Sequence, residues 1–322
     1  MARLKEYNGH YCESEYEYAF IGFLEAEGWK YSSGNNIHRV TKRDILIVDD
    51  FKKFIADTNP DLTEEEATQI YDNVRLVGAE SDFATLHKVY GWMVNGVQFT
   101  PQDGLPRMIP LIDFDNLDKN IFRVVNQFTV EYTNNGQKEN RRLDVLLFVN
   151  GMPLCVVELK NPADANATIY DAWEQINIRY WRDIPHLLHY CPLACISDGV
   201  KTRLGTVRTP YEHFYAWRRV NDGDAVSTLP FEETETMIKG VYAPERFLEI
   251  FRDYIYFQDS IYDSDEVEIV CRYPQFFAAR LLKQSIINSV VQKSGKGGTY
   301  FGATGCGKTY TMAFLARQLA LR

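Results

Sequence analysis

Two carboxylates and one lysine lie in two apolar segments of the sequence, residues 141–149 and 153–160. Asp144 belongs to the first segment, and Glu158 and Lys160 lie at the end of the second. Two carboxylates that lie close together can share a hard divalent cation such as Mg²⁺. A neighbouring ammonium group can orient or activate a water molecule. The three side chains therefore make a candidate metal site, provided that the chain brings them together.

The turn between the two segments decides whether the three side chains meet. Asn150-Gly151 between apolar runs predicts a β-hairpin, in which Glu158 and Lys160 face the same side. A strict two-residue turn would place Asp144 on the opposite face from Glu158, whereas a three-residue loop would place their β-carbons ~5 Å apart. We expect a three-residue or bulged turn. A hairpin with solvated charges is the alternative, but the nearly continuous apolar runs favour strands covered on both faces.

A second candidate site lies near the end of the sequence. Residues 302–309 have the spacing of a phosphate-binding P-loop, preceded by a short apolar segment and followed by a helical pattern. Glycines allow the backbone N–H groups to close around phosphate oxygens at a helix N-terminus, while the lysine reaches the β- and γ-phosphates and the threonine binds Mg²⁺. The nucleotide contacts predicted here are Gly302, Gly305, Gly307, Lys308 and Thr309.

Helices and strands must position both sites. Thr63 and Glu66 predict a capping box at the start of one helix. The acidic, polar segment 258–268 is a candidate linker, which predicts two domains, residues 1–265 and 266–322. Helical patterns occupy residues 13–28, 41–57, 63–77, 168–181 and 275–291, and strand patterns occupy 96–100, 121–132, 193–197 and 299–301 in addition to the hairpin.

Composition limits the class of protein. The 322 residues are 45% hydrophobic and 25% charged, which is typical of a globular chain with a sizeable core. We see no secretory signal and no apolar run long enough to span a membrane, and the six scattered cysteines are typical of reduced thiols in a cytoplasmic protein. The net charge of −9 means that any DNA contact needs a local basic patch. One basic cluster could contact the phosphates of a DNA backbone or form an ordinary solvated surface. It consists of Arg179, Arg182, Lys201, Arg203, Arg208, Arg218 and Arg219.

The hairpin resembles a known family. Arg-Leu-Asp144-Val, Asn-Gly-Met-Pro-Leu and Val-Val-Glu158-Leu-Lys160-Asn are similar to the nuclease domain of the restriction (R) subunit of type I restriction-modification enzymes, members of the PD-(D/E)xK superfamily. The likeness also includes the Glu-rich first helix, residues 196–199 and the P-loop. It implies an α/β fold: a mixed central sheet flanked by helices in the endonuclease domain, followed by an incomplete RecA-like ATPase domain.

The resemblance also implies roles for individual residues. Asp144 and Glu158 correspond to metal ligands and Lys160 to the catalytic lysine. The family has a Gln-x-x-x-Tyr element after this lysine, which makes Gln175 a further site residue. Tyr180 is one residue too far along the chain, and one extra residue rotates a helical position by about 100°, so its role stays open.

Two further assignments come from the resemblance. Glu15 on the first helix matches an auxiliary acidic metal ligand, with Glu13 and Glu17 as competing candidates. Gln275 matches the glutamine that contacts adenine in the family, although the preceding tyrosine and proline are exchanged here. Pro274 also suits a helix start, so a role at the N-terminus of the helix is the alternative.

The function implied is that of an ATP-dependent type I site-specific deoxyribonuclease. Such a subunit cuts double-stranded DNA with Mg²⁺, translocates DNA with ATP, and works with modification (M) and specificity (S) subunits. The alternatives are a type III or RecB-like helicase–nuclease and a non-catalytic docking module. No Walker B acid is encoded before Arg322. We therefore expect these 322 residues to bind Mg²⁺ but to turn over no ATP and to bind nucleotide weakly or not at all.

Overall fold

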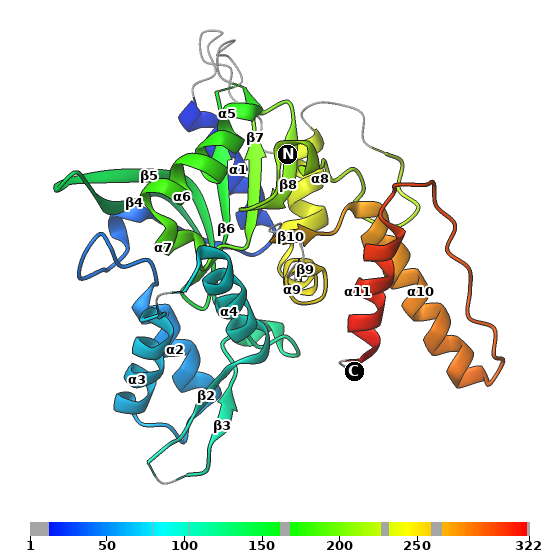
Figure 1. Ribbon diagram of the computed structural model, residues 1–322, viewed down its shortest axis with the longest axis horizontal. Helices are drawn as coiled ribbons and strands as arrows, with labels where there is room; N and C mark the ends of the chain where they lie inside the picture. The colour runs from blue at the N-terminus through cyan, green and yellow to red at the C-terminus, as the bar shows by residue number, and fades with distance from the viewer. Residues whose placement is uncertain are drawn as a thin grey trace.

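A mixed β-sheet forms the centre of the protein (Figure 1). The computed structural model describes residues 13–78, 80–102, 104–161, 168–226, 232–258 and 266–320. The sheet order is β1-β4-β5-β6-β7-β8; the β1–β4 and β6–β7 pairs are parallel, and the other pairs are antiparallel. The strands are β1 (Lys30–Ser33), β4 (Phe122–Asn134), β5 (Gln137–Val149), β6 (Met152–Leu159), β7 (Leu193–Ser197) and β8 (Thr202–Thr206). The expected mixed sheet is confirmed.

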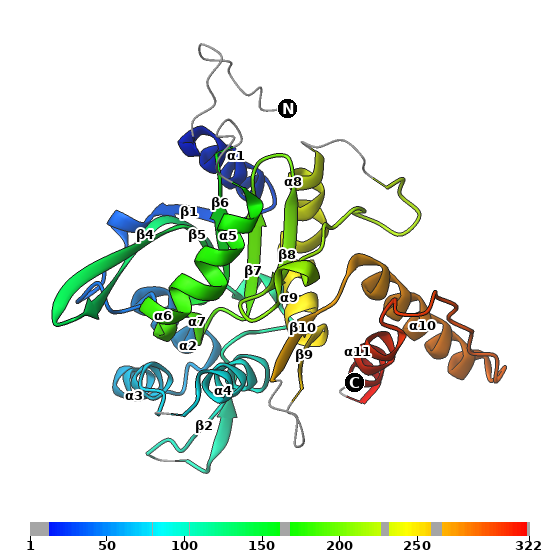
Figure 2. The same cartoon turned by 45° about the horizontal axis from the view of Figure 1, so that its top comes forward.

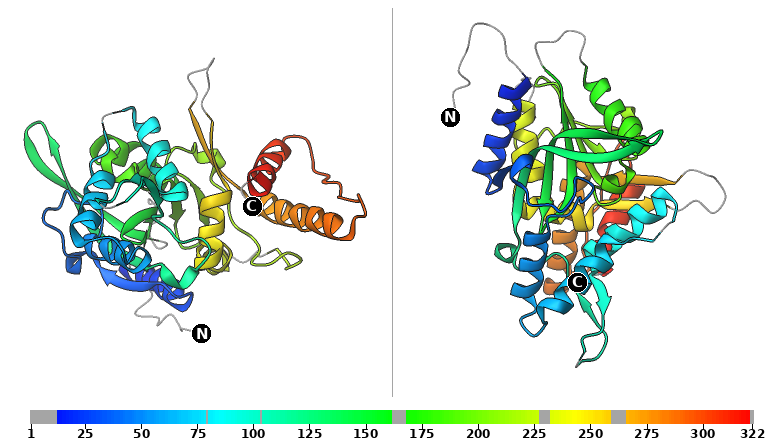
Figure 3. Two further views of the ribbon diagram at one scale, coloured as in Figure 1. Left: turned by 90° about the horizontal axis from the view of Figure 1, so that it is seen from below. Right: turned by 90° about the vertical axis from the view of Figure 1, so that its left-hand side faces the viewer.

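Helices cover both faces of this sheet. The right-hand view of Figure 3 shows α1 (Glu13–Ala26) and α8 (Glu232–Met237) on one side and α5 (Ile169–Glu174) on the other. All eight residues of β6 are buried, which explains why its sequence is apolar up to Glu158 rather than alternating. The remaining helices of this part are α6 (Trp181–Asp183), α7 (Pro185–Leu188), α9 (Pro244–Asp253), two π-helices (Gln175–Tyr180, Ile238–Tyr242) and three 3₁₀ turns (Gly34–Asn36, Leu117–Lys119, Tyr211–His213).

The β5–β6 hairpin combines a two-residue turn with a bulge. Asn150 and Gly151 both have positive φ, 51° and 77°, as a tight hairpin turn requires. Phe148 pairs with Pro153, but the preceding residue of β5 pairs with Cys155, so the register shifts by one residue. A shift of one residue changes which side chains share a face. The expected bulged turn is confirmed.

Gly151 makes this turn intolerant of a side chain. An added β-carbon would overlap the carbonyl oxygen of Ile47 and lie 2.9 Å from the nitrogen of Phe51. Gly151→Ala is therefore expected to lower the free energy of unfolding by roughly 2–5 kcal/mol, from left-handed strain and overpacking. Gly136 has a similar φ of 80°, but a β-carbon added there would have no atom within 4 Å. Gly136→Ala should therefore lower the free energy of unfolding only by the strain of the left-handed backbone. Urea denaturation measures both losses, and equal losses would contradict the proposed overlap.

A smaller layer of helices lies beyond one end of the sheet, as Figure 1 shows. The predicted capping box is confirmed: Thr63 and Glu66 each bond the other's backbone N–H. These elements are α2 (Val48–Thr58), α3 (Glu64–Arg75), α4 (Asp82–Asn95), and the two-stranded sheet of β2 (Val97–Phe99) and β3 (Arg107–Ile109).

The helix predicted from residue 41 begins only at Val48. Two local interactions hold the preceding residues in another conformation. The carboxylate of Asp44 accepts hydrogen bonds from the backbone and hydroxyl of Thr41. The backbone N–H of Ile47 donates to the carbonyl of Gly151, 2.8 Å away. Because the hairpin accepts a hydrogen bond from this N–H, the apolar residues before Val48 are buried outside the helix.

The C-terminal residues form two long helices beside the sheet-containing part. Figure 2 shows α10 (Tyr273–Gln292) and α11 (Lys308–Ala320) at one side of the molecule. The two-stranded sheet of β9 (Ile255–Gln258) and β10 (Val267–Val270) precedes them. These strands overlap both ends of the predicted linker, residues 258–268, of which residues 259–265 lie outside the described residues. None of the helices in the described ranges is long and apolar enough to cross a membrane.

The strand predicted at residues 299–301 is not formed, and Phe301 is 93% exposed. A single strand without a neighbour has no partners for its backbone N–H and C=O groups, so the isolated segment gains nothing from being extended.

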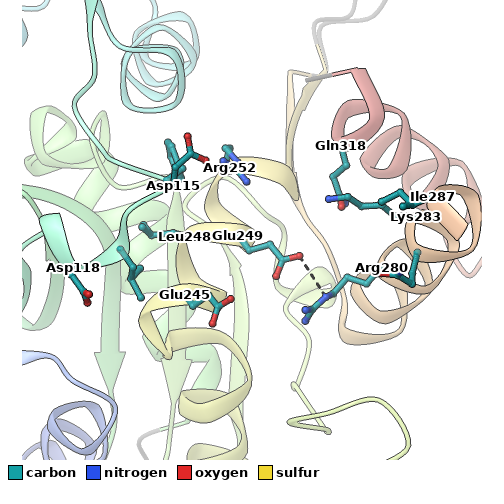
Figure 4. Close-up of a pocket in the computed structure, with 13 residues that line it drawn as sticks. Asp115, Asp118, Glu245, Leu248, Glu249, Arg252, Arg280, Lys283, Ile287 and Gln318 are labelled. Carbon is teal, nitrogen blue, oxygen red and sulfur yellow. Dashed lines mark ion pairs between the residues drawn. The ribbon is translucent and has the colours of Figure 1, made fainter. Parts of the chain in front are cut away.

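A charged cavity of about 590 Å³ separates α9 from α10 and α11 (Figure 4). Acidic residues on the α9 side face Arg280 and Lys283 of α10, and Glu249 forms an ion pair with Arg280 at 3.6 Å. Tyr254 also contacts the ring of Phe314 on α11. These contacts connect the C-terminal helices to the first part of the chain.

Candidate functional site

The register beyond the bulge brings the two carboxylates together. Val145 pairs with Val157 in these antiparallel strands. The residue before Val145, Asp144, therefore lies opposite the residue after Val157, which is Glu158. Oδ2 of Asp144 accepts a hydrogen bond of 2.9 Å from the backbone N–H of Leu159. Glu158 is only 1% exposed. A buried carboxylate at the end of a core strand needs polar partners, because burial without them costs several kcal/mol.

Lys160 supplies one of these partners. Its Nζ donates to Oε1 of Glu158 at 2.8 Å and to Oε1 of Gln175 at 3.0 Å. Its backbone N–H donates to the carbonyl of Ser197 on the neighbouring strand, which holds this residue in line with the sheet. The structure therefore brings together Asp144, Glu158, Lys160 and Gln175, as the sequence predicts.

Tyr180 belongs to the same group, although its spacing left its role open. Residues 175–180 form a π-helix, in which hydrogen bonds join residues five apart instead of four. Gln175 and Tyr180 consequently lie on the same side, and Nε2 of Gln175 donates to the Tyr180 hydroxyl at 2.8 Å. That hydroxyl donates to Oε2 of Glu158, also at 2.8 Å. The wider helical turn absorbs the extra residue.

The electrostatics of the group follow from its burial. Loss of water raises the pKa of Glu158 above its usual value, and the ammonium of Lys160 opposes this rise. Hydrogen bonds with the side chains of Tyr180 and Asp144 oppose it further. Burial and the nearby charge of Glu158 raise the pKa of the Tyr180 phenol well above its usual value, which keeps it a hydrogen-bond donor.

The donor set fits a hard cation through two carboxylates. Mg²⁺ in proteins is commonly bound by one or two carboxylates together with water and substrate phosphate oxygens. Within the described ranges, no three His, Cys, Asp or Glu side chains form a group that could hold a metal ion. The role of Glu15 as a third ligand beside Asp144 and Glu158 stays a prediction.

The acidic residues of α1 have a different environment. This helix covers the sheet face opposite α5, and the Glu15 side chain on it is half-buried. Glu17 is 5% exposed and accepts hydrogen bonds from Asn126 at 2.6 Å and from Gln127 at 2.5 Å. Glu17 is thus directed into the sheet, and the side chain of Glu13 lies outside the described residues.

The P-loop residues form a turn at the start of α11. Gly305 and Gly307 have φ of 79° and 81°, the left-handed conformation that glycine adopts without strain. Nζ of Lys308 donates to the carbonyl oxygens of Gly302 and Ala303 at 2.8 and 2.9 Å. The lysine therefore lies inside the loop, where phosphate oxygens would lie, and Thr309 follows it at the exposed start of the helix.

Gln275 contacts this loop from the start of α10. Its Nε2 donates to the carbonyl oxygen of Gly307 at 3.2 Å, and its Oε1 accepts from the backbone N–H of Arg272 at 2.9 Å. It therefore caps the helix and contacts the P-loop at once. Gln275, Gly305 and Gly307 line a common cavity of about 700 Å³, which is within the range of small-molecule sites.

Comparison with known proteins gives the family. The sequence profile described as "Type I restriction enzyme R protein N terminus" matches residues 11–213. The chain belongs to this family. The profile covers the whole acid-pair site, from the hairpin to the π-helix.

Two relatives of known name resemble the chain over most of its length. One is the putative type I restriction enzyme MjaIXP endonuclease subunit of Methanocaldococcus jannaschii, 30% identical over 94% of this chain and 31% of the relative. The type I restriction enzyme HindI endonuclease subunit of Haemophilus influenzae is 28% identical over 95% of this chain and 30% of the relative. The chain thus spans about a third of the length of the family members it matches.

Proposed function

We propose that this chain carries the DNA-cleaving centre of a type I restriction endonuclease subunit. The observation that carries the proposal is the hydrogen-bonded group of Asp144, Glu158, Lys160, Gln175 and Tyr180 on paired strands and the adjoining π-helix. The names of the relatives, which are endonuclease subunits, support it. The arrangement also fits a nuclease fold of the PD-(D/E)xK type.

Each residue has a chemical role in the proposed cleavage of a phosphodiester bond. Asp144 and Glu158 would hold Mg²⁺, which would supply a Lewis acid at the phosphate. The ammonium of Lys160 lies 2.8 Å from Glu158 and orients the attacking water beside the phosphate. Gln175 binds Lys160, and Tyr180 binds Glu158, so these two residues of the π-helix fix the orientation of the groups that act.

The P-loop supports a second activity in the longer subunit. We propose that Gly302, Gly305, Gly307, Lys308 and Thr309 bind the phosphates of ATP, and that Gln275 contacts the adenine. The residues from 266 onward would then begin a RecA-like motor that moves duplex DNA. Modification and specificity subunits would complete the assembly, as the type I restriction system named for the relatives suggests.

Metal titration tests the acid pair. Isothermal calorimetry of the 322-residue chain with Mg²⁺ or Mn²⁺ should show binding that Asp144→Asn weakens at least about tenfold, since one charged ligand is lost. Asp57→Asn, at an exposed position on α2, is the control and should bind as the unsubstituted chain does. Equal affinities in all three proteins would contradict the proposed site.

Tyr180→Phe tests the contribution of the π-helix. The substitution removes only the hydroxyl that donates to Glu158. A hydrogen bond to a charged group contributes about 1.5–3 kcal/mol, so metal affinity should fall by roughly 10- to 100-fold. Tyr190→Phe, which removes a buried hydroxyl bonded to the carbonyl of Val74, is the matched control. Isothermal calorimetry with Mn²⁺ measures the metal affinity of both variants. A loss of affinity in Tyr190→Phe but not in Tyr180→Phe would contradict the role assigned to Tyr180.

A further inference from the structure

Two arginines lie on the same sheet face as the acid pair. Across the sheet, Glu158 pairs with Ile196, and Ile196 pairs with Arg203. Directly paired residues point to the same face, so Arg203 shares the face of Glu158, two strands or roughly 10 Å away. Arg142 precedes Asp144 by two residues on β5 and therefore also shares this face. One arginine thus lies across the strands from the carboxylates and the other along a strand.

Neither guanidinium is paired with a carboxylate in the part of the chain that the structure describes. Among the described residues, no carboxylate oxygen lies within 4.0 Å of the side-chain nitrogens of Arg142 or Arg203. The neighbouring Arg141, by contrast, forms an ion pair of 2.6 Å with Asp183. Unpaired cations on one face are notable in a chain of net charge −9, because acidic partners are abundant. Arg142 is exposed and Arg203 is half-buried.

An aromatic support holds Arg203 in place. Its guanidinium carbon lies 5.5 Å from the centre of the Tyr211 ring, within the range of a cation–π contact. Tyr211 in turn packs against Tyr170 and Trp173 of α5, with ring centres 5.0 and 6.1 Å away. The same helix leads into the π-helix of the acid-pair site. The arginine is therefore placed by the same element that places Gln175.

We propose that Arg142 and Arg203 bind the sugar–phosphate backbone of the DNA strand that the acid pair cleaves. The proposal rests on the proposed nuclease function and adds the residues that position the substrate. One DNA strand carries a phosphate for each 3.4 Å of rise, so a separation of roughly 10 Å places Arg203 on a phosphate within about three nucleotides of the scissile one. Guanidinium groups bind phosphate oxygens through paired N–H donors, and such contacts carry no sequence preference.

Salt dependence of DNA binding tests the proposal. The probe is a short fluorescent DNA duplex of arbitrary sequence, titrated with the 322-residue chain in EDTA at several KCl concentrations, so that neither metal nor cleavage contributes. Each lost phosphate contact should reduce the slope of log K against log[salt] by about 0.9. Arg203→Gln and Arg142→Gln should each show this reduction with about tenfold weaker binding at low salt. In the double variant the slope of log K against log[salt] should be reduced by about 1.8. Arg203→Lys keeps the charge and should have the same slope as the unsubstituted chain.

Controls separate this proposal from the nuclease assignment. Arg75→Gln changes the net charge equally but lies on α3, in an ion pair with Asp72; its slope should match that of the unsubstituted chain. Slopes of the Arg142 and Arg203 variants equal to that of Arg75→Gln, or no DNA binding by the unsubstituted chain, would overturn the proposal. Because Arg142 is exposed, Arg142→Gln gives a result even if Arg203→Gln does not fold.

Metal titration supplies the remaining distinction. Both arginine variants should bind Mn²⁺ as tightly as the unsubstituted chain, and weakened metal binding would mean that the arginines act through the acid pair instead of on DNA. Asp144→Asn should lose metal binding while keeping the salt slope. If Asp144→Asn kept its metal affinity, the nuclease assignment would fail, whereas the salt slopes would still decide whether these arginines bind DNA.

Discussion

Lys160→Ala in a full-length subunit, assembled with its modification and specificity partners, is expected to lower the rate of DNA cleavage by about 10²–10⁴-fold. The substitution removes the ammonium group that contacts both Glu158 and Gln175, so the water loses its orienting group and Glu158 loses its counter-charge. ATP hydrolysis should stay largely unchanged, because the P-loop is a separate site at the start of α11. Plasmid cleavage and phosphate release, measured on one preparation, check both expectations.

The control for this prediction is Lys138→Ala. The Lys138 side chain is 78% exposed, near the tip of the β4–β5 hairpin, so its loss changes the charge equally without touching the acid pair. Asp144→Ala should behave like Lys160→Ala, because it removes a proposed metal ligand. Normal DNA cleavage by Asp144→Ala or Lys160→Ala would refute the nuclease site. Loss of ATP hydrolysis together with cleavage would indicate misfolding or coupling between the two sites.

Lys308→Ala in the same assembled enzyme is expected to lower ATP hydrolysis by at least about 10²-fold. The Lys308 ammonium lies within the loop, bonded to two backbone carbonyl oxygens, where it would instead bind the β- and γ-phosphates when nucleotide enters. Cleavage that depends on translocation should be lost as well, whereas metal binding at Asp144 and Glu158 should persist. Lys296→Ala, at an exposed position before the loop, is the matched control.

Steady-state phosphate release and Mn²⁺ calorimetry separate these effects. ATP hydrolysis by Lys308→Ala close to that of Lys296→Ala would show that residues 302–309 do not bind the nucleotide phosphates. Lost metal binding would show instead that the two sites are not independent.

Local signals were sufficient to predict the two candidate sites. The dipeptide Asn150-Gly151 indicates a hairpin because its residues adopt positive φ at low cost, as they do in the structure. The acid pair then requires a register shift, and the bulge in β6 supplies it. The P-loop is predicted for the same kind of reason, since its glycines and lysine lie next to one another in the sequence.

Features that depend on distant residues could not be predicted in this way. Gln127 takes a φ of 53° in the middle of β4, and its side chain binds Glu17, 110 residues earlier in the chain. The segment 299–301 has the composition of a strand but pairs with none of the described strands. The start of α2 depends on a hydrogen bond between Ile47 and Gly151. In each case the presence or absence of a partner far away in sequence decides the local conformation.

The π-helix at residues 175–180 changes how relatives of this protein should be sought. A search pattern that demands three residues between glutamine and tyrosine would miss this chain, because here four residues separate them. The contacts from Gln175 to Tyr180 and from Tyr180 to Glu158 nevertheless form. One inserted residue can thus enter the helix while the geometry at Glu158 is kept. Patterns for this family should therefore allow a variable gap at this point and require the glutamine and the tyrosine themselves.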